Sequence, residues 1–123
     1  MVYLDTNCLI RLITNDDPVK ADKVEKIMVS KTFSVPEVVF PELEYVLIKV
    51  YKSNRLAVLN SFKSLLANQR GKISKFVKGA IDYYENSNLD MADCLIAAHS
   101  LSGELASFDK TLLRLAKVKK YWK

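Results

Sequence analysis

Short apolar runs alternate along this chain with longer segments in which hydrophobic residues recur at helical spacing. The apolar runs at 2–5, 32–35 and 104–108 have the length and composition of buried strands. Residues 72–74 and 118–122 are weaker strand candidates. The segments with helical spacing are 8–13, 18–30, 38–51, 55–68, 75–86, 91–102 and 110–116. Strands that alternate with helices predict a three-layer α/β fold with a mostly parallel sheet.

Polar residues at the ends of these segments support the predicted helix boundaries. Asp17 followed by Pro18 predicts a helix start, because aspartate accepts hydrogen bonds from first-turn amides and proline fits the first helical position. Asp90 is a favourable N-cap for the apolar helix that follows it, and Gly103 predicts where that helix ends.

The helix predicted at 38–51 contains a proline and two glutamates. Inside a helix the Pro41 ring removes a hydrogen bond and collides with the preceding turn, so we expect the regular helix to begin near Pro41 or to kink there. Glu42 and Glu44 point about 200° apart, because each helical residue turns by about 100°. Only one can face a common site, and the other is expected in solvent. Spacing leaves the choice open, although the helix start favours the charge of Glu42.

Length and composition indicate one soluble domain that covers residues 1–123. Half of the residues are hydrophobic and 27% are charged, which is typical of globular proteins. No apolar run approaches the roughly 18 to 20 residues that a membrane span needs. Asp5 lies too early in the chain for a signal peptide. We therefore expect a cytoplasmic protein with no membrane association.

Positive charge is concentrated at the C-terminal end. The net charge is +5, and no acidic residue follows Asp109. The basic residues beyond it are Lys110, Arg114, Lys117, Lys119, Lys120 and Lys123. Such a segment is either a solvated end of the chain or a surface that contacts the backbone of a nucleic acid.

Acidic residues lie where predicted strands end or predicted helices begin. Asp5 and Asp109 follow predicted strands, whereas Asp90 and Asp93 begin the apolar helix. An ionised carboxylate in apolar surroundings is costly unless a cation or hydrogen bonds compensate it. Ligands of α/β sheets bind at the carboxyl ends of strands, so these acids favour a divalent cation and phosphodiester chemistry, with helix capping as the alternative for Asp5 and Asp90. Crowded acids without metal should include at least one with a raised pKa.

The remaining reactive side chains form no recognisable catalytic pattern. Cys8 and Cys94 lack metal-ligand spacing and are expected to be small buried hydrophobes. His99, the only histidine, lies about 120° around the helix from Asp93 and is expected to be a surface or structural residue. Phosphatases of the haloacid dehalogenase type resemble the chain's opening, but they need a second aspartate where this chain has Asn7, which cannot act as the general acid.

Four segments, taken together, resemble the signature of PIN-domain nucleases, and in particular of the VapC-type toxins of toxin–antitoxin pairs. These segments are LDTN (4–7), PELEYVL (41–47), LDMADCLIAA (89–98) and ASFDKTL (106–112). They occur in the family's order and the resemblance covers essentially the whole chain.

The resemblance implies a site and an activity. Its acidic residues correspond to Asp5, Glu42, Asp93 and Asp109, which would hold one or two Mg²⁺ or Mn²⁺ ions for the hydrolysis of RNA. Asp90 corresponds to an additional, variable ligand. The polar companions of the acids correspond to Thr6, Asn7 and Ser107, and Lys110, Arg114 and Lys117 are expected to contact the RNA backbone.

The resemblance also implies an architecture and partners. The family's sheet has about five strands in the order 3-2-1-4-5, and its members usually form homodimers and bind an antitoxin protein whose peptide covers the acidic groove. One helix face is equally consistent with the protein's own core and with a dimer contact: Leu56, Leu59, Phe62 and Leu66. The competing functions are a PIN-like module that binds RNA or protein without catalysis and a metal-dependent phosphatase.

Overall fold

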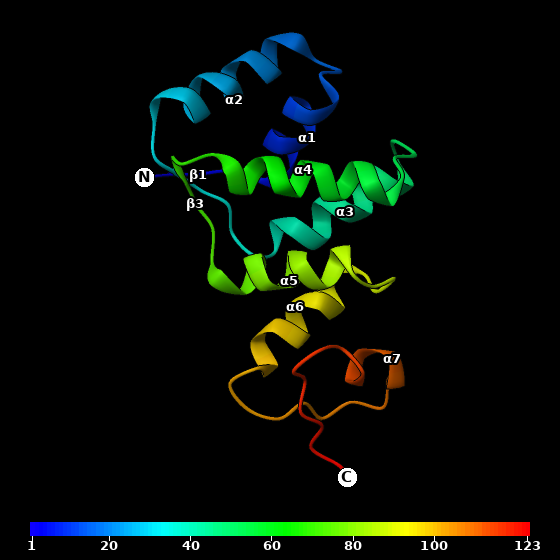
Figure 1. Ribbon diagram of the computed structural model, residues 1–123. Helices are drawn as coiled ribbons and strands as arrows, with labels where there is room; N and C mark the ends of the chain where they lie inside the picture. The colour runs from blue at the N-terminus through cyan, green and yellow to red at the C-terminus, as the bar shows by residue number, and fades with distance from the viewer. The chain divides into compact units, whose positions relative to one another are not determined.

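The computed structural model describes residues 1–123, which form two compact units, Met1–Ser74 and Lys75–Lys123 (Figure 1). The first unit contains a parallel sheet and four helices. The second unit consists of three helices and their connections. The chain is thus an α/β protein, as its alternating pattern predicts.

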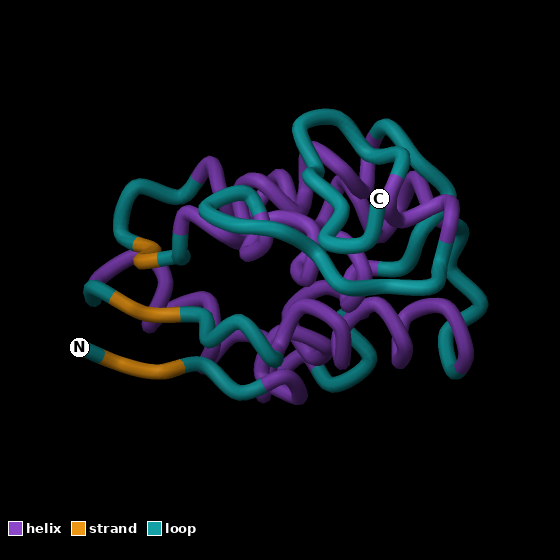
Figure 2. Tube along the Cα trace, turned by 90° about the horizontal axis from the view of Figure 1, so that it is seen from below, coloured by secondary structure: helices purple, strands orange, loops and turns teal.

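The sheet of the first unit has three short parallel strands, which lie side by side in Figure 2. They are β1 (Val2–Tyr3), β2 (Phe33–Ser34) and β3 (Gly71–Lys72), in the order β1-β2-β3. Phe33 of the central strand pairs with Val2 on one side and with Gly71 on the other. This order corresponds to the 3-2-1 half of the expected sheet.

The first unit contains four helices, α1 (Thr6–Thr14), α2 (Pro18–Ser30), α3 (Val39–Lys49) and α4 (Arg55–Ala67). Helix α1 packs against α2 and α3, and α3 packs against α4. On α4, Leu59 and Phe62 are buried, Leu66 is half-buried and Leu56 is exposed, so most of the face that suited either core or dimer contact belongs to the core. The ring of Phe62 meets that of Phe40 edge to face, with centroids 5.4 Å apart.

Local chemistry accounts for the starts of α2 and α3. Asp17 accepts a hydrogen bond of 3.2 Å from the amide of Lys20, and Pro18 occupies the first helical position, as predicted. Helix α3 begins at Val39, so Pro41 lies in its first turn. The amides of that turn have no partner within the helix, so the missing N–H of Pro41 costs no hydrogen bond there. The helix therefore starts near Pro41 and continues without interruption to Lys49.

The second unit is built on the pairing of α5 (Lys75–Glu85) with α6 (Met91–Ser100), followed by the short α7 (Lys110–Leu113). Asp90 caps α6, as predicted, and Gly103 lies in the turn that follows it. A cluster of apolar side chains joins α6 and α7 in the core of this unit. It consists of Ala97, Leu105 and Leu112, with Tyr83, Leu89, Leu113, Leu115 and Val118 packed against them.

The strands expected at 104–108 and 118–122 reduce to one isolated parallel bridge between Leu105 and Lys120. Within 104–108 only Leu105 is buried. The Ser107 hydroxyl accepts a hydrogen bond from the amide of Asp109, and such side-chain bonds compete with a strand ladder. The sheet therefore has three strands where about five were expected. No helix combines the length and apolar character needed to cross a membrane.

Candidate functional site

All five acidic residues of interest lie at the N-termini of helices. Asp5, Asp90 and Asp109 are the N-caps of α1, α6 and α7, while Glu42 and Asp93 lie in the first turns of α3 and α6. Helix N-termini stabilise negative charge through their unpaired amides and the helix dipole. For Asp5 and Asp90, the capping role that the sequence left as an alternative is therefore present, and it leaves other carboxylate lone pairs free for a ligand.

The expected apolar surroundings of these acids are present only in part. Asp5, Glu42, Asp90 and Asp109 are exposed, and Asp93 alone is half-buried. Asp5, Asp90 and Asp109 are cap residues, which stand outside the helix whose apolar face is buried, so apolar neighbours in the sequence do not place their side chains in the core.

Within the first unit, Asp5 and Glu42 line one cavity of about 350 Å³, together with Thr6 and Asn7. Asp5 Oδ1 accepts a hydrogen bond of 2.7 Å from the Thr6 amide. The Thr6 hydroxyl in turn donates to Glu42 Oε1 at 2.9 Å, across 36 positions of sequence. The end of β1 and the start of α3 are thereby joined through Thr6, and we call this cavity the acidic cavity.

Glu44 occupies a different environment from the one expected. It is 8% exposed, whereas Glu42 is exposed in the acidic cavity. Phe40 and Leu47, four residues before and three after Glu44, are buried on the same face of α3. The expectation that the glutamate turned away from the site would lie in solvent is therefore wrong, because the opposite face of α3 packs into the core.

In the second unit, hydrogen bonds hold the two capping aspartates in place. Asp90 Oδ1 accepts the amide of Asp93 at 2.9 Å. Asp109 Oδ1 accepts the amides of Thr111 at 2.9 Å and Leu112 at 3.1 Å. The Ser107 hydroxyl accepts the amide of Asp109 at 3.0 Å, so Ser107 positions this acid through its backbone.

The pKa of the Asp93 carboxyl is raised above its ordinary value. Burial is the largest cause, because it disfavours the charged form, and the negative charges of Asp90 and Asp109 add to it. One raised pKa among the acids agrees with the expectation from their crowding. Burial nevertheless contributes more than the repulsion on which that expectation was based.

The side chains present have the chemistry that a hard divalent cation requires. The acidic cavity presents carboxylate, hydroxyl and amide oxygens, which are ligands of Mg²⁺ and Mn²⁺. In the second unit, the mutual repulsion of Asp90, Asp93 and Asp109 is of the kind that a bound cation relieves. Within either unit, however, no three His, Cys, Asp or Glu side chains are grouped closely enough to hold an ion by themselves.

Sequence patterns did not reveal a polar network that includes two lining residues of the acidic cavity. Arg11 and Tyr51 both line the cavity and both contact Asp16 Oδ2, through an ion pair of 2.9 Å and a hydroxyl donated at 2.7 Å. These bonds, led by the one from Tyr51, hold the pKa of Asp16 below its usual range. Tyr51 lies 35 positions from Asp16, and no local signal indicates that pairing.

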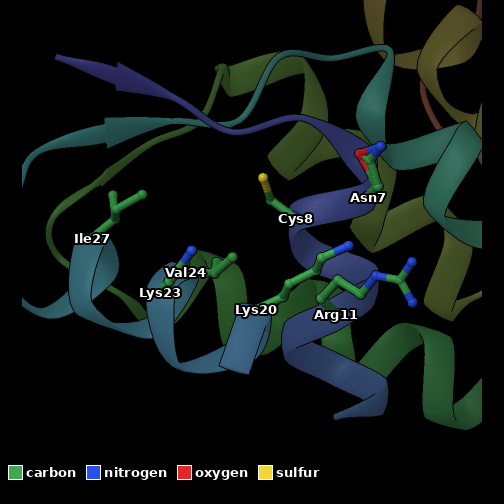
Figure 3. Close-up of a pocket in the computed structure, with 7 residues that line it drawn as sticks. All are labelled: Asn7, Cys8, Arg11, Lys20, Lys23, Val24 and Ile27. Carbon is green, nitrogen blue, oxygen red and sulfur yellow. The ribbon is translucent and has the colours of Figure 1, made fainter. Parts of the chain in front are cut away.

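A second cavity lies between α1 and α2, with a volume of about 370 Å³ (Figure 3). Asn7 and Arg11 line both this cavity and the acidic cavity. Lys20 and Lys23 from α2 also line it, and Cys8 is half-buried at its wall. Only the second cysteine, Cys94, is fully buried as expected for both.

The three basic residues expected to bind RNA do not all line the same cavity. Arg114 and Lys117 line a cavity of about 470 Å³ beside α5, whereas Lys110 is exposed at the start of α7. His99 is exposed and its ring stacks on Phe76 with centroids 3.9 Å apart, in accordance with a surface role.

Comparison with known families identifies the chain. The PIN domain family matches residues 2–118, which include all the acidic residues described above. No curated protein and no solved structure matches the chain. Members of the PIN domain family are generally metal-dependent nucleases.

Proposed function

The chain belongs to the PIN domain family, and we propose that it is a metal-dependent endoribonuclease. The acidic cavity carries this proposal, because Asp5 and Glu42 line it together and Thr6 joins them through two hydrogen bonds. Asp93 and Asp109 are proposed to complete the ligand set, with Asp90 as an additional ligand. The family match, which extends over both compact units, supports a single PIN-like domain over residues 1–123.

We assign distinct tasks to the chain's own residues. Thr6 would aim the Glu42 carboxylate by its hydroxyl, and Ser107 would position Asp109 through the backbone amide. Asn7 adds an amide to the wall of the acidic cavity. When bound to these acids, Mg²⁺ or Mn²⁺ lowers the pKa of a water molecule and offsets the charge of the phosphate.

The substrate is proposed to be a nucleic acid on the basis of charge, and RNA on the basis of the resemblance to VapC-type toxins. The net charge of +5 favours a polyanion over a small phosphate ester, and basic residues follow Asp109 without an intervening acid. Lys110, Arg114 and Lys117 are proposed to contact the RNA backbone, in sequence-independent contacts that position the strand.

The biological role is proposed from the four segments that resemble VapC-type toxins. The protein would act in the cytoplasm as a homodimer and would be held inactive by an antitoxin peptide lying over the acidic cavity. The complete sheet would have about five strands in the order 3-2-1-4-5 within three layers, and the Leu105–Lys120 bridge supports the pairing of the last two. Growth arrest on expression, relieved by a small neighbouring open reading frame, is the test of the toxin role.

One assay tests the chemistry. Single-stranded RNA, structured RNA and a phosphomonoester are each incubated with the protein in Mn²⁺, Mg²⁺ or EDTA. We expect metal-dependent RNA cleavage that Asp5→Asn abolishes and that Glu25→Gln, which removes an exposed carboxylate on α2, leaves unchanged. Turnover of the phosphomonoester alone would show that the protein is a phosphatase and not a nuclease. RNA binding without cleavage would show that it is a binding module.

A thermal melt tests the metal directly. An ion at ten times its Kd stabilises the folded state by about 1.4 kcal/mol. For 123 residues, with an unfolding entropy of about 2.1 cal/mol/K per residue, this corresponds to a rise in Tm of about 5 °C. The rise should shrink in Asp93→Asn and persist in Glu25→Gln. Equal shifts in all three proteins would show that the cation binds elsewhere.

A further inference from the structure

Three aromatic side chains gather on the surface of the second unit. Phe108 is 89% exposed, Tyr121 58% and Trp122 52%. The Phe108 and Trp122 rings stack almost in parallel, with centroids 4.9 Å apart and planes 9° apart. Tyr121 meets Trp122 edge to face at 5.7 Å. We call these three residues the aromatic platform.

Backbone hydrogen bonds hold the platform in place. The amide of Leu105 donates to the Lys119 carbonyl at 2.7 Å, and the amide of Tyr121 donates to the Leu105 carbonyl at 2.9 Å. These two bonds fix the segment of Tyr121 and Trp122 beside Leu105. On the other side, Phe108 is followed directly by Asp109, which caps α7. The rings are therefore exposed on an anchored backbone, which lowers the entropy lost when a ligand binds.

Exposed lysines lie close to the platform residues in the chain, and the platform adjoins the proposed ligand Asp109. Lys119 and Lys120 precede it in the chain, are exposed and take part in no ion pair, and Lys110 lies two residues after Phe108. The acidic residue Glu104, next to Leu105, forms an ion pair of 3.7 Å with Lys123. Exposed aromatic rings among unpaired lysines are the combination by which proteins bind single-stranded nucleic acid.

We propose that the aromatic platform is a nucleobase-stacking subsite for single-stranded RNA next to the cleavage site. The inference rests on the proposed function, because Phe108 adjoins the proposed ligand Asp109. A base stacks on the outer face of Phe108, while the lysines neutralise the adjoining phosphates. A base-paired RNA cannot supply the subsite with a free base, so the platform selects single-stranded over duplex substrate and tolerates any base identity.

Trp122 reports directly on the subsite, since it is the only tryptophan of the chain. Fluorescence of the Asp5→Asn variant of the whole 123-residue chain in EDTA is followed while a short mixed-sequence single-stranded RNA is added. We expect quenching by the single strand, less by the duplex of the same sequence, and none by inorganic polyphosphate, which supplies charge without bases. Equal quenching by polyphosphate and RNA would overturn stacking.

Kinetics of the otherwise wild-type chain give the second test. We expect Phe108→Ala to raise KM for single-stranded RNA about tenfold, with kcat and Tm little changed, because one stacked base is lost. Phe108→Tyr should restore KM. Leu56→Ala, at another exposed apolar residue on α4, is the matched control and should leave KM unchanged. An unchanged KM in Phe108→Ala would refute the subsite.

The outcomes separate this inference from the proposed function. RNA cleavage with an unaltered KM in Phe108→Ala would refute the stacking subsite and would support the proposed nuclease activity. Quenching by single-stranded RNA without any cleavage by the wild type would refute the nuclease activity and would support the stacking subsite. Sedimentation that shows a dimer without RNA, lost in Phe108→Ala, would assign these rings to contact with a second copy of the chain and overturn the subsite.

Discussion

Replacing Gly71 by alanine should destabilise the first unit through a single steric contact. A Cβ at this position would lie 2.8 Å from Cε2 and 2.9 Å from Cζ of Phe33, whereas carbon atoms prefer separations of about 3.5 to 4.0 Å. Phe33 is fully buried and pairs with Gly71 in the sheet, so its ring has no room to swing away. The backbone of Gly71 does not have a positive φ, so the expected cost is purely steric.

The size of the effect follows from the cost of overpacking. Inserting a methyl group into a packed core costs about 1 to 3 kcal/mol. A chain of 123 residues loses about 0.26 kcal/mol of stability per kelvin near its Tm, so Gly71→Ala should lower Tm by about 4 to 12 °C. In contrast, a Cβ on Gly79 in α5 would meet only Ala98 Cβ at an ordinary 3.6 Å. Gly79→Ala should therefore stabilise the chain by about 0.5 to 1 kcal/mol.

Thermal and urea melts of the two variants, followed by circular dichroism, measure these opposite signs. Phe33→Leu supplies the decisive control, because a smaller side chain removes the ring that the new methyl group would meet. Gly71→Ala should cost less stability in the Phe33→Leu background than in the wild type. The same cost in both backgrounds, or no cost in the wild type, would refute the steric explanation.

Three further predictions concern the proposed site. Thr6→Val removes the hydroxyl donated to Glu42 and should lower kcat about fivefold, corresponding to about 1 kcal/mol, with little change in Tm; an unaltered kcat would show that Glu42 needs no such support. The raised pKa of Asp93 means that the folded state binds its proton more tightly, so stability falls as pH rises through that pKa. Asp93→Asn in EDTA should therefore be more stable than the wild type at neutral pH, and this gain should vanish in acid. Asp109→Asn keeps an N-cap and Asp109→Ala loses it, so both should lose RNA cleavage but only the alanine variant should lose about 1 kcal/mol in a chemical melt.

Contacts that no sequence pattern signals account for the features that sequence reasoning missed. The burial of Glu44 depends on which face of α3 packs into the core, and the spacing of two glutamates carries no such information. The contact of Asp16 with Tyr51 depends on how the segments that follow α1 and α3 meet in space. The expected strand at 104–108 is only a bridge at Leu105, and the Ser107 hydroxyl accepts a hydrogen bond from the backbone beside it. The apolar run from which the strand was predicted carries no information about that bond.

The sequence by itself determined the local structure and the family. Helix starts at Asp17, at Asp90 and near Pro41 were predictable because capping and proline chemistry act within a few residues. Four short segments were sufficient for the resemblance to the PIN domain family, which the match over residues 2–118 confirms. Only the tertiary structure decided that Thr6 bonds to Glu42 and that Phe108 stacks on Trp122. Those pairs are far apart in the chain, and the packing that brings them together depends on the burial of the whole apolar surface rather than on any local pattern.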